Sequence, residues 1–280
     1  MVGVNGKAII PNTNLYQYFE GTANQPTKIH LNSKPGLEGS RVIQVVPVAN
    51  ETQLRNIDWV EGNRRKVDEL SGGKLAYVYI PNTGQPGYTS FNRYYFAQQD
   101  KKGAVIDERN NGGGSAADYI VDIMARDLHG YFNSRANDHR PFTTPMSGIW
   151  GPKVMLINER AGSGGDLLPY LFNKMEIGTL IGTKTWGGLV GTWDTPPFVD
   201  GGRMVAPRGG FYDVNGEWAV EGVGISPDIL VEQTPKDVIE GRDPQLERAV
   251  KEALDRIPTE SIELKPEPKA PIRYFRPKGN

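Results

Sequence analysis

Residues 103–119, GAVIDERNNGGGSAADY, place an apolar run, three consecutive glycines and the start of a helical pattern in one stretch. Residues 153–168, KVMLINERAGSGGDLL, repeat this order with a serine among the small residues. A continuous apolar run that is followed by a glycine turn and an amphipathic segment indicates a doubly covered strand, a tight turn and a helix. We therefore expect an α/β protein built from repeated βα units.

The same alternation extends on both sides of these segments. Further strands are predicted at Leu75–Ile80 and Leu180–Gly182. A hairpin through Asn215-Gly216 is expected to pair residues 203–206 and 210–214 with residues 217–220. Apolar residues at helical spacing predict four helices: Ser90–Gln99, Ser115–Leu128 with Ser115 as N-cap, Asp166–Met175 and Asp243–Leu254.

The first 50 residues have a different character. Asn5-Gly6 is a tight-turn dipeptide, a short helix is plausible around Asn14–Glu20, and Thr27–Leu31 and Arg41–Val48 are predicted strands. These strands are too few for a whole domain, so we interpret the segment as part of a small β-rich module.

The expected domain organisation follows from these changes of pattern. Residues 1–50 form the partial module, and residues 51–72 carry charges at helical spacing typical of a solvated connecting helix. Residues 73–257 form the α/β core. The stretch 258–280, rich in Pro, Lys and Glu, is expected to be a loose surface tail.

Composition excludes several classes of function. The 280 residues are 38% hydrophobic, which is enough for a core, and the net charge of −1 argues against nucleic acid as the main partner. No apolar run approaches the roughly 18 residues that span a bilayer, so no membrane partner is expected. The chain has no Cys, which excludes disulfides and a cysteine nucleophile. No metal-ligand motif is present, and we expect no cofactor.

The glycine turn at 112–114 is the first candidate site. It lies between a buried strand and a helix N-terminus, where exposed backbone N–H groups suit an oxyanion. Phosphate is the competing ligand, but neither nucleotide-binding glycine motif is present. A tight turn that needs positive φ is the purely structural alternative.

Ser163 is the second candidate. It stands in the run A-G-S-G-G at a sharp strand-to-helix turn, which is how a nucleophile is presented at the end of a sheet. The following N–H, that of Gly164, can then donate to a developing oxyanion. The alternative is a Gly/Ser-rich loop in which Ser163 only caps the helix.

A serine nucleophile requires a base, and the sequence offers none that is convincing. His129 lies at the far end of a predicted helix, about 20 Å from the turn at ~1.5 Å per residue. His139 lies in a polar stretch and His30 in the partial module, and we interpret all three as surface or structural residues. Lys184 is a weak candidate for Ser–Lys catalysis.

Glu221 follows a predicted strand and precedes a glycine-rich turn. A carboxylate at this point can orient a catalytic partner as one member of a triad-like chain. An exposed turn glutamate is the alternative interpretation.

Four separated motifs resemble the tricorn-type, tail-specific serine peptidases, in the order that the family has them. They are residues 158–166, NERAGSGGD; 181–191, IGTKTWGGLVG; 222–228, GVGISPD; and 238–248, VIEGRDPQLER. The resemblance implies a crotonase-like α/β core, with residues 1–50 similar to the second half of a PDZ-like domain. It implies a peptide or unfolded-protein substrate and a homo-oligomer, often a hexamer.

The resemblance also implies residue roles. Ser163 matches the nucleophile of a Ser-His-Ser-Glu tetrad, and Glu221 matches its carboxylate. Gly112 or Gly113, together with Gly164, matches the oxyanion hole. Some family members carry Asp at the position of Gly164, and residues 130–133 offer no secure acidic group for a basic substrate side chain, so the resemblance does not predict the cleavage-site preference.

One departure from the family pattern dominates the functional expectation. The family's His and its helper Ser lie in a helical domain before the PDZ-like module, and no residue here matches them. We therefore expect this chain to be the C-terminal portion of a longer enzyme, partnered by a His-bearing upstream domain and weakly active or inactive alone. A cytoplasmic location is favoured, with the periplasm as the alternative.

Two other functions stay open at this point. One is a non-catalytic fragment that binds peptides through the PDZ-like remnant. The other is an acyl-thioester enzyme of the broader crotonase-like class, which would use the same two-donor oxyanion hole.

Overall fold

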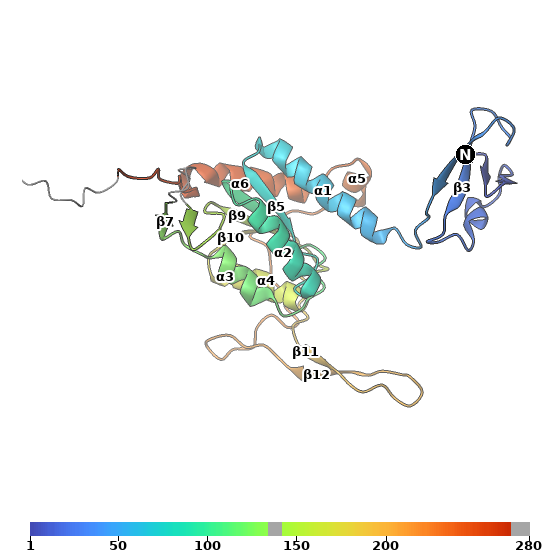
Figure 1. The fold of residues 1–280 in the computed structure, drawn as a ribbon. Helices are drawn as coiled ribbons and strands as arrows, with labels where there is room; N and C mark the ends of the chain where they lie inside the picture. The colour runs from blue at the N-terminus through green and yellow to red at the C-terminus, as the bar shows by residue number, and fades with distance from the viewer. Residues whose placement is uncertain (134–141, 270–280) are drawn as a thin grey trace, which may run out of the picture. The chain divides into compact units, whose positions relative to one another are not determined.

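The computed structural model describes residues 1–133 and 142–269, and it divides the chain into two compact units (Figure 1). The first unit is Met1–Glu61 and the second is Gly62–Asn280. Each unit has its own sheet.

The first unit contains a small antiparallel sheet with the strand order β2-β1-β3-β4. The turn predicted at Asn5-Gly6 is confirmed, with positive φ at both residues. The predicted short helix is the 3-10 helix η1, Leu15–Phe19. The strands are β1 (Gly3–Val4), β2 (Lys7–Ala8), β3 (Thr27–Leu31) and β4 (Arg41–Val45).

The second unit is built on a five-stranded parallel sheet with the strand order β13-β10-β9-β6-β5. The apolar runs at residues 75–79, 103–107 and 153–157 are confirmed as strands, and every residue of these strands is buried. The expected α/β architecture is therefore present. The strands are β5 (Leu75–Tyr79), β6 (Gly103–Asp107), β9 (Lys153–Ile157), β10 (Gly178–Gly182) and β13 (Ile229–Leu230).

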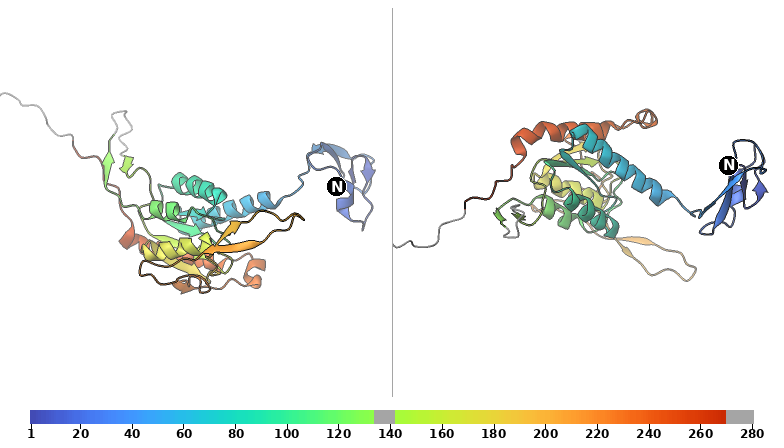
Figure 2. Two further views of the ribbon diagram at one scale, coloured as in Figure 1. Left: turned by 90° about the horizontal axis from the view of Figure 1, so that it is seen from below. Right: turned by 45° about the horizontal axis from the view of Figure 1, so that its top comes forward.

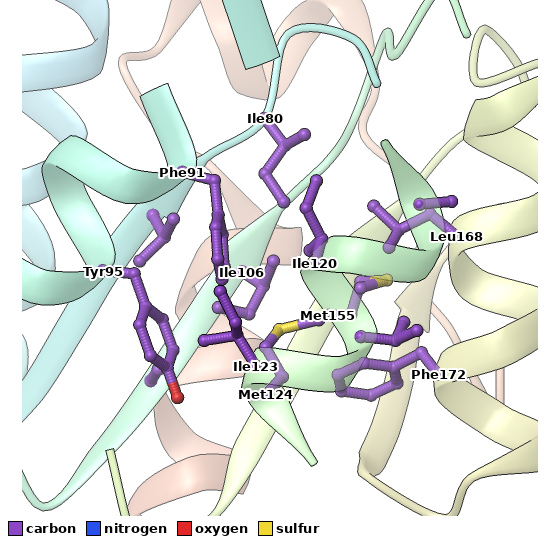
Figure 3. Packing of buried hydrophobic residues seen from close by; sticks show 14 of the residues in the cluster. Ile80, Phe91, Tyr95, Ile106, Ile120, Ile123, Met124, Met155, Leu168 and Phe172 are labelled. Carbon is purple, nitrogen blue, oxygen red and sulfur yellow. The ribbon is translucent and has the colours of Figure 1, made fainter. Parts of the chain in front are cut away.

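Alternate residues of these strands serve two hydrophobic layers. Ile106 and Met155 point into a cluster with side chains of α2 (Gln85–Ala97), α3 (Ala117–Met124) and α4 (Gly164–Lys174) (Figure 3). On the other face lies α6 (Pro244–Glu260), which contacts all four of the strands β5, β6, β9 and β10. Helices thus cover both faces, which explains why the strands are apolar without alternation.

The helix boundaries differ from the predictions at informative places. α3 begins at Ala117, not at Ser115, and Ser115 is not its N-cap. The N–H of Ala116 donates instead to the carbonyl of Thr83 at 2.7 Å, so a neighbouring loop satisfies the start of the helix. At the other end of the chain, α6 runs to Glu260 through Pro258, where we expected the tail to begin. A salt bridge between Arg256 and Glu260 supports this last turn.

The predicted hairpin through Asn215-Gly216 is confirmed for residues 211–213 and 217–219, and the prediction is wrong for residues 203–206. Residues 205–209 form β12 (Val205–Gly209), which pairs with β11 (Gly191–Asp194) and not with residues 217–220. Across the turn, Tyr212 and Trp218 form a bridge, the N–H of Asp213 donates to the carbonyl of Glu217 at 2.8 Å, and the N–H of Ala219 donates to the carbonyl of Phe211 at 3.2 Å. Figures 1 and 2 show the β11–β12 ribbon projecting from the layered part of its unit.

The remaining elements are short or connect the layers. α1 (Thr52–Ser71) confirms the predicted connecting helix, and its course crosses the boundary between the two units. β7 (Gly130–Phe132) pairs with β8 (Phe142–Thr144), and α5 (Pro235–Ile239) precedes α6. Among the described helices, none combines the length and apolar character needed to cross a membrane.

Candidate active site

Ser163 occupies a strained turn between β9 and α4. Its φ of 57° and ψ of −119° lie in a region that residues with a Cβ rarely adopt. Its N–H donates to the carbonyl of Gly188 at 3.0 Å, and its carbonyl accepts from the N–H groups of Asp166 and Leu167. The side chain is half-buried and therefore partly open to solvent. This geometry is that of a serine presented at the end of a sheet.

The two glycine turns meet at this serine. A Cβ built on Gly113 would lie 2.6 Å from the Cβ and 3.0 Å from the Oγ of Ser163. A Cβ on Gly164 would overlap both Thr83 Oγ1 and the carbonyl of Gly114. Only glycine fits at positions 113 and 164, because each approaches the other turn closely.

Some backbone N–H groups of these turns donate to protein oxygens and others do not. Gly113 donates to Asn111 Oδ1 at 2.9 Å, and Gly112 makes a long bond of 3.4 Å to the carbonyl of Pro81. Among the described residues, no oxygen accepts a hydrogen bond from the N–H of Gly114 or Gly164. Gly164 also begins α4, so its N–H lies at the positive end of the helix dipole. These two N–H groups are available to an oxyanion.

Asn111 connects the two turns. It is fully buried, and its carbonyl accepts from the N–H of Gly162 at 3.0 Å. Its Nδ2 donates to Glu108 Oε2 at 3.0 Å. Glu108 is fully buried, and its Oε1 has no hydrogen-bond partner among the described residues. Burial raises the pKa of the Glu108 carboxyl well above its usual range, and the nearby Asp166 and Asp107 add to this effect.

Asp166 supports the turn on the other side of Ser163. Its Oδ1 accepts from the N–H of Gly187 at 2.8 Å, and its Oδ2 accepts from the N–H of Gly188 at 3.0 Å. Because Gly188 in turn holds the N–H of Ser163, this buried carboxyl fixes the peptide that faces the serine.

Glu221 belongs to the same group of loops. It is exposed, and its Oε2 accepts from the N–H groups of Leu189 and Val190 at 2.6 and 2.7 Å. The neighbouring Gly222 donates to the carbonyl of Gly187 at 2.7 Å. The structure thus ties Glu221 to the segment that contacts Ser163, although the carboxyl itself bonds to backbone.

Trp186 is a prominent surface feature beside the serine. Its side chain is 70% exposed, and its ring lies against Gly162 and Gly188, where a Cβ would collide with it. The backbone N–H of Trp186 donates to the carbonyl of Ala161 at 2.9 Å. An exposed indole at this position offers an apolar surface to a bound ligand.

In the part of the chain that the structure describes, no basic side chain is hydrogen-bonded to Ser163. Among residues 1–133 and 142–269, no side chain forms a hydrogen bond with Ser163 Oγ. His129 is exposed on a loop near β8, His30 pairs with Ser40 in the first unit, and Lys184 is exposed. His139 lies outside the described residues.

Sequence reasoning missed three residues that shape this site. Thr83 is fully buried against the N-terminus of α4, and its Oγ1 has no partner among the described residues. Asn111 and Asp166 were seen only as parts of polar turns, and their roles depend on contacts with loops about 50 and about 20 positions away in the chain. Their only sequence signal is a polar residue directly beside consecutive glycines.

The fold and this turn define an α/β protein that presents a serine between a parallel strand and a helix. The sequence pattern of Peptidase family S41 matches residues 74–231, and the chain therefore belongs to that family. The tricorn protease of Thermoplasma acidophilum is 31% identical over 265 residues, which cover 95% of this chain and 24% of that protein. Tricorn protease homolog 1 of Streptomyces coelicolor is 34% identical over 254 residues, 91% of this chain and 24% of that protein.

The solved structures agree with the sequence comparison. The crystal structure of the tricorn protease superimposes with a TM-score of 0.85 at 30% identity, covering 92% of this chain and 25% of that one. The predicted resemblance to tricorn-type peptidases is thereby confirmed. The chain spans about a quarter of the length of these relatives.

Proposed function

We propose that this chain supplies the nucleophile and the oxyanion hole of a serine peptidase that cleaves peptides through an acyl-enzyme on Ser163. The observation that carries the proposal is the strained Ser163 turn, against which Gly113 packs so closely that no side chain fits between them. Membership of peptidase family S41 supports it.

The reaction would proceed in two steps. Ser163 Oγ attacks the scissile carbonyl carbon while its proton passes to a base, and the carbonyl oxygen becomes an oxyanion. That oxygen accepts from the N–H of Gly164 and from an N–H of the 112–114 turn. The C–N bond then breaks, the amine takes the proton, and water hydrolyses the resulting Ser163 ester.

The identity of the second oxyanion donor is refined by the hydrogen bonds of the turn. We expected Gly112 or Gly113, but both already donate to protein oxygens, Gly113 at 2.9 Å. Gly114 has the N–H without an acceptor among the described residues, so it joins the two as a candidate.

The base is the missing component. No described side chain bonds to Ser163 Oγ, so we propose that a histidine from outside these residues completes the site. In this view Glu221 would orient that imidazole, directly or through a further hydroxyl, and the chain alone would be weak or inactive. The proposed partners of the chain are further copies of itself in a homo-oligomer and a domain that carries the histidine.

The experiment is chemical rescue of the chain itself. The purified protein is incubated with a fluorophosphonate probe, with and without free imidazole, and the adduct is located by mass spectrometry. We expect labelling at Ser163 that imidazole accelerates by about 10-fold or more, because a general base contributes about 10²–10⁴-fold when it is positioned. Ser163→Ala is the control, and Asp166→Asn should slow the reaction.

Absence of any adduct at Ser163 in the presence of imidazole would overturn the proposal. Saturable binding of a fluorescent peptide by that unreactive protein would favour the non-catalytic fragment. Binding of coenzyme A would instead favour an acyl-thioester enzyme.

A further inference from the structure

Asn111 connects the two glycine turns through hydrogen bonds of both its backbone and its side chain. Asn111 accepts from Gly162 with its carbonyl, accepts from Gly113 with Oδ1, and donates from Nδ2 to Glu108. Its own N–H donates to the carbonyl of Glu108 at 3.0 Å. The backbone N–H, the backbone carbonyl, Oδ1 and Nδ2 of this buried residue each make a hydrogen bond within the site.

The packing around Asn111 is as close as its hydrogen bonding. A Cβ on Gly165 would lie 2.5 Å from the Asn111 carbonyl oxygen and 3.0 Å from its Cβ and Cγ. The first turn of α4 thus rests directly on Asn111. Any change in its position moves both the Gly113 peptide and the helix that begins beside Ser163.

Glu108 fixes the orientation of the Asn111 amide. An amide can rotate by 180° and exchange its oxygen and nitrogen, and only a neighbouring acceptor selects one orientation. Glu108 Oε2 provides that acceptor, so Asn111 Oδ1 faces Gly113. The charged groups that face Glu108 are Asp107 and Asp166, and both are acidic, so a neutral carboxyl is the form that fits there.

We propose that Asn111 and Glu108 form a positioning pair that sets the spacing between the two glycine turns, and with it the geometry of the oxyanion hole. The inference rests on the proposed function for its effect on rate. Neither residue touches substrate: both act through the peptides of residues 113 and 162–164.

The test combines a structural and a kinetic readout on the whole chain. The first is amide hydrogen exchange of Gly113 and Gly162, measured by NMR on protein labelled with ¹⁵N-glycine. We expect both amides to lose protection in Asn111→Ala and in Glu108→Ala, and to keep it in Glu108→Gln. Gln rescues because its carbonyl oxygen can still accept from Asn111 Nδ2.

The second readout is the fluorophosphonate reaction of Ser163 in the presence of imidazole, separated into probe affinity and maximal rate. Asn111→Ala and Glu108→Ala should lower the maximal rate by about 100-fold with little change in affinity, because displacing an oxyanion donor by about 1 Å has this effect. Glu108→Gln should stay within about threefold of the parent. Asn63→Ala is the control for loss of a buried amide, because among the described residues the Asn63 amide donates to the Tyr77 hydroxyl and not to either glycine turn.

Two outcomes would overturn the positioning pair. One is unchanged exchange of the Gly113 and Gly162 amides in folded Asn111→Ala. The other is a rate for Glu108→Gln as low as that for Glu108→Ala. If the parent protein is not labelled at all, the proposed function fails, and the exchange experiment still decides whether the pair holds the turns.

Discussion

Each of the two units of this chain contains one sheet, and the strands of the two sheets are buried to very different degrees. In the second unit, all five residues of β5, β6 and β9 are buried between helical layers. In the first unit, four of the five residues of β4 are exposed, and Val4 and Ile29 are its buried apolar side chains outside α1. A parallel sheet that is covered on both faces can hold turns rigidly at its carboxyl end, whereas the first sheet has almost no core of its own.

The largest expected effect tests the buried ion pairs of the second unit. Arg109 is 4% exposed, and its guanidinium bonds to Asp107 and Asp243 at 2.6–3.0 Å. Arg109→Ala leaves two buried carboxylates without their cation, so we expect it to destabilise this unit by about 3–5 kcal/mol. Urea unfolding followed by circular dichroism measures the change.

The matched variant in the first unit is Arg55→Ala. Arg55 pairs with Glu51 at 2.6 Å, but both side chains are more than half exposed. We expect no measurable change in unfolding, because exposed pairs are screened by solvent. A large effect at Arg55 would show that α1 depends on surface charge.

The second prediction compares apolar truncations in the two sheets. Ile106→Ala removes a side chain that is 0% exposed, and should cost about 2–5 kcal/mol. Val42→Ala removes one that is 52% exposed, and should change stability by less than about 0.5 kcal/mol. The change in amide hydrogen exchange of peptides from each unit, measured for each variant, reports how far each truncation destabilises its own unit. Equal effects would mean that Val42 is covered in the protein in solution.

The third prediction concerns pH. The folded state raises the pKa of Glu108 above its usual value of 4.5, so the stability linked to its proton is present below that value and is lost as pH rises toward the folded pKa. Glu108→Gln carries no such proton. Its stability relative to the parent should increase with pH above about 4.5, by up to about 1.4 kcal/mol per pH unit.

Thermal unfolding of both proteins from pH 5 to pH 8 measures this difference. A constant difference across the range would show that Glu108 is ionised in the folded protein. The first unit has no buried carboxyl among its described residues, so the effect belongs to the second unit.

The last prediction concerns the backbone strain at Ser163, whose expected effect is smaller than those of the buried substitutions above. A left-handed φ costs a residue with a Cβ about 1–2 kcal/mol relative to glycine. Ser163→Gly should therefore be more stable than Ser163→Ala by about 1 kcal/mol, as measured by urea unfolding. Equal stability of the two variants would indicate that the turn relaxes when the hydroxyl is removed.

The sequence predicted best where one short segment carries the whole signal. Continuous apolar runs predict the buried strands at residues 75–79, 103–107 and 153–157. The run of small residues around Ser163 predicts the sharp turn. The family resemblance rests on the Ser163 turn and on three further motifs, at residues 181–191, 222–228 and 238–248.

Prediction failed where the partner comes from elsewhere in the chain. β12 pairs with β11 and not with the nearer 217–220 segment, and the start of α3 is satisfied by Thr83 and not by Ser115. The contacts of Asn111 and Asp166 were invisible for the same reason. A polar residue in a turn acquires its role only when a second turn packs against it.

The position of Asn111 also has a consequence for how this protein ages. Asparagine followed by glycine is the sequence most prone to spontaneous deamidation, and Asn111 is followed by Gly112. We expect the buried, hydrogen-bonded amide of Asn111 to react more slowly than the exposed Asn5-Gly6 and Asn215-Gly216 sites. Conversion to aspartate would set a second carboxyl against Glu108 and remove the Nδ2 donor that holds it.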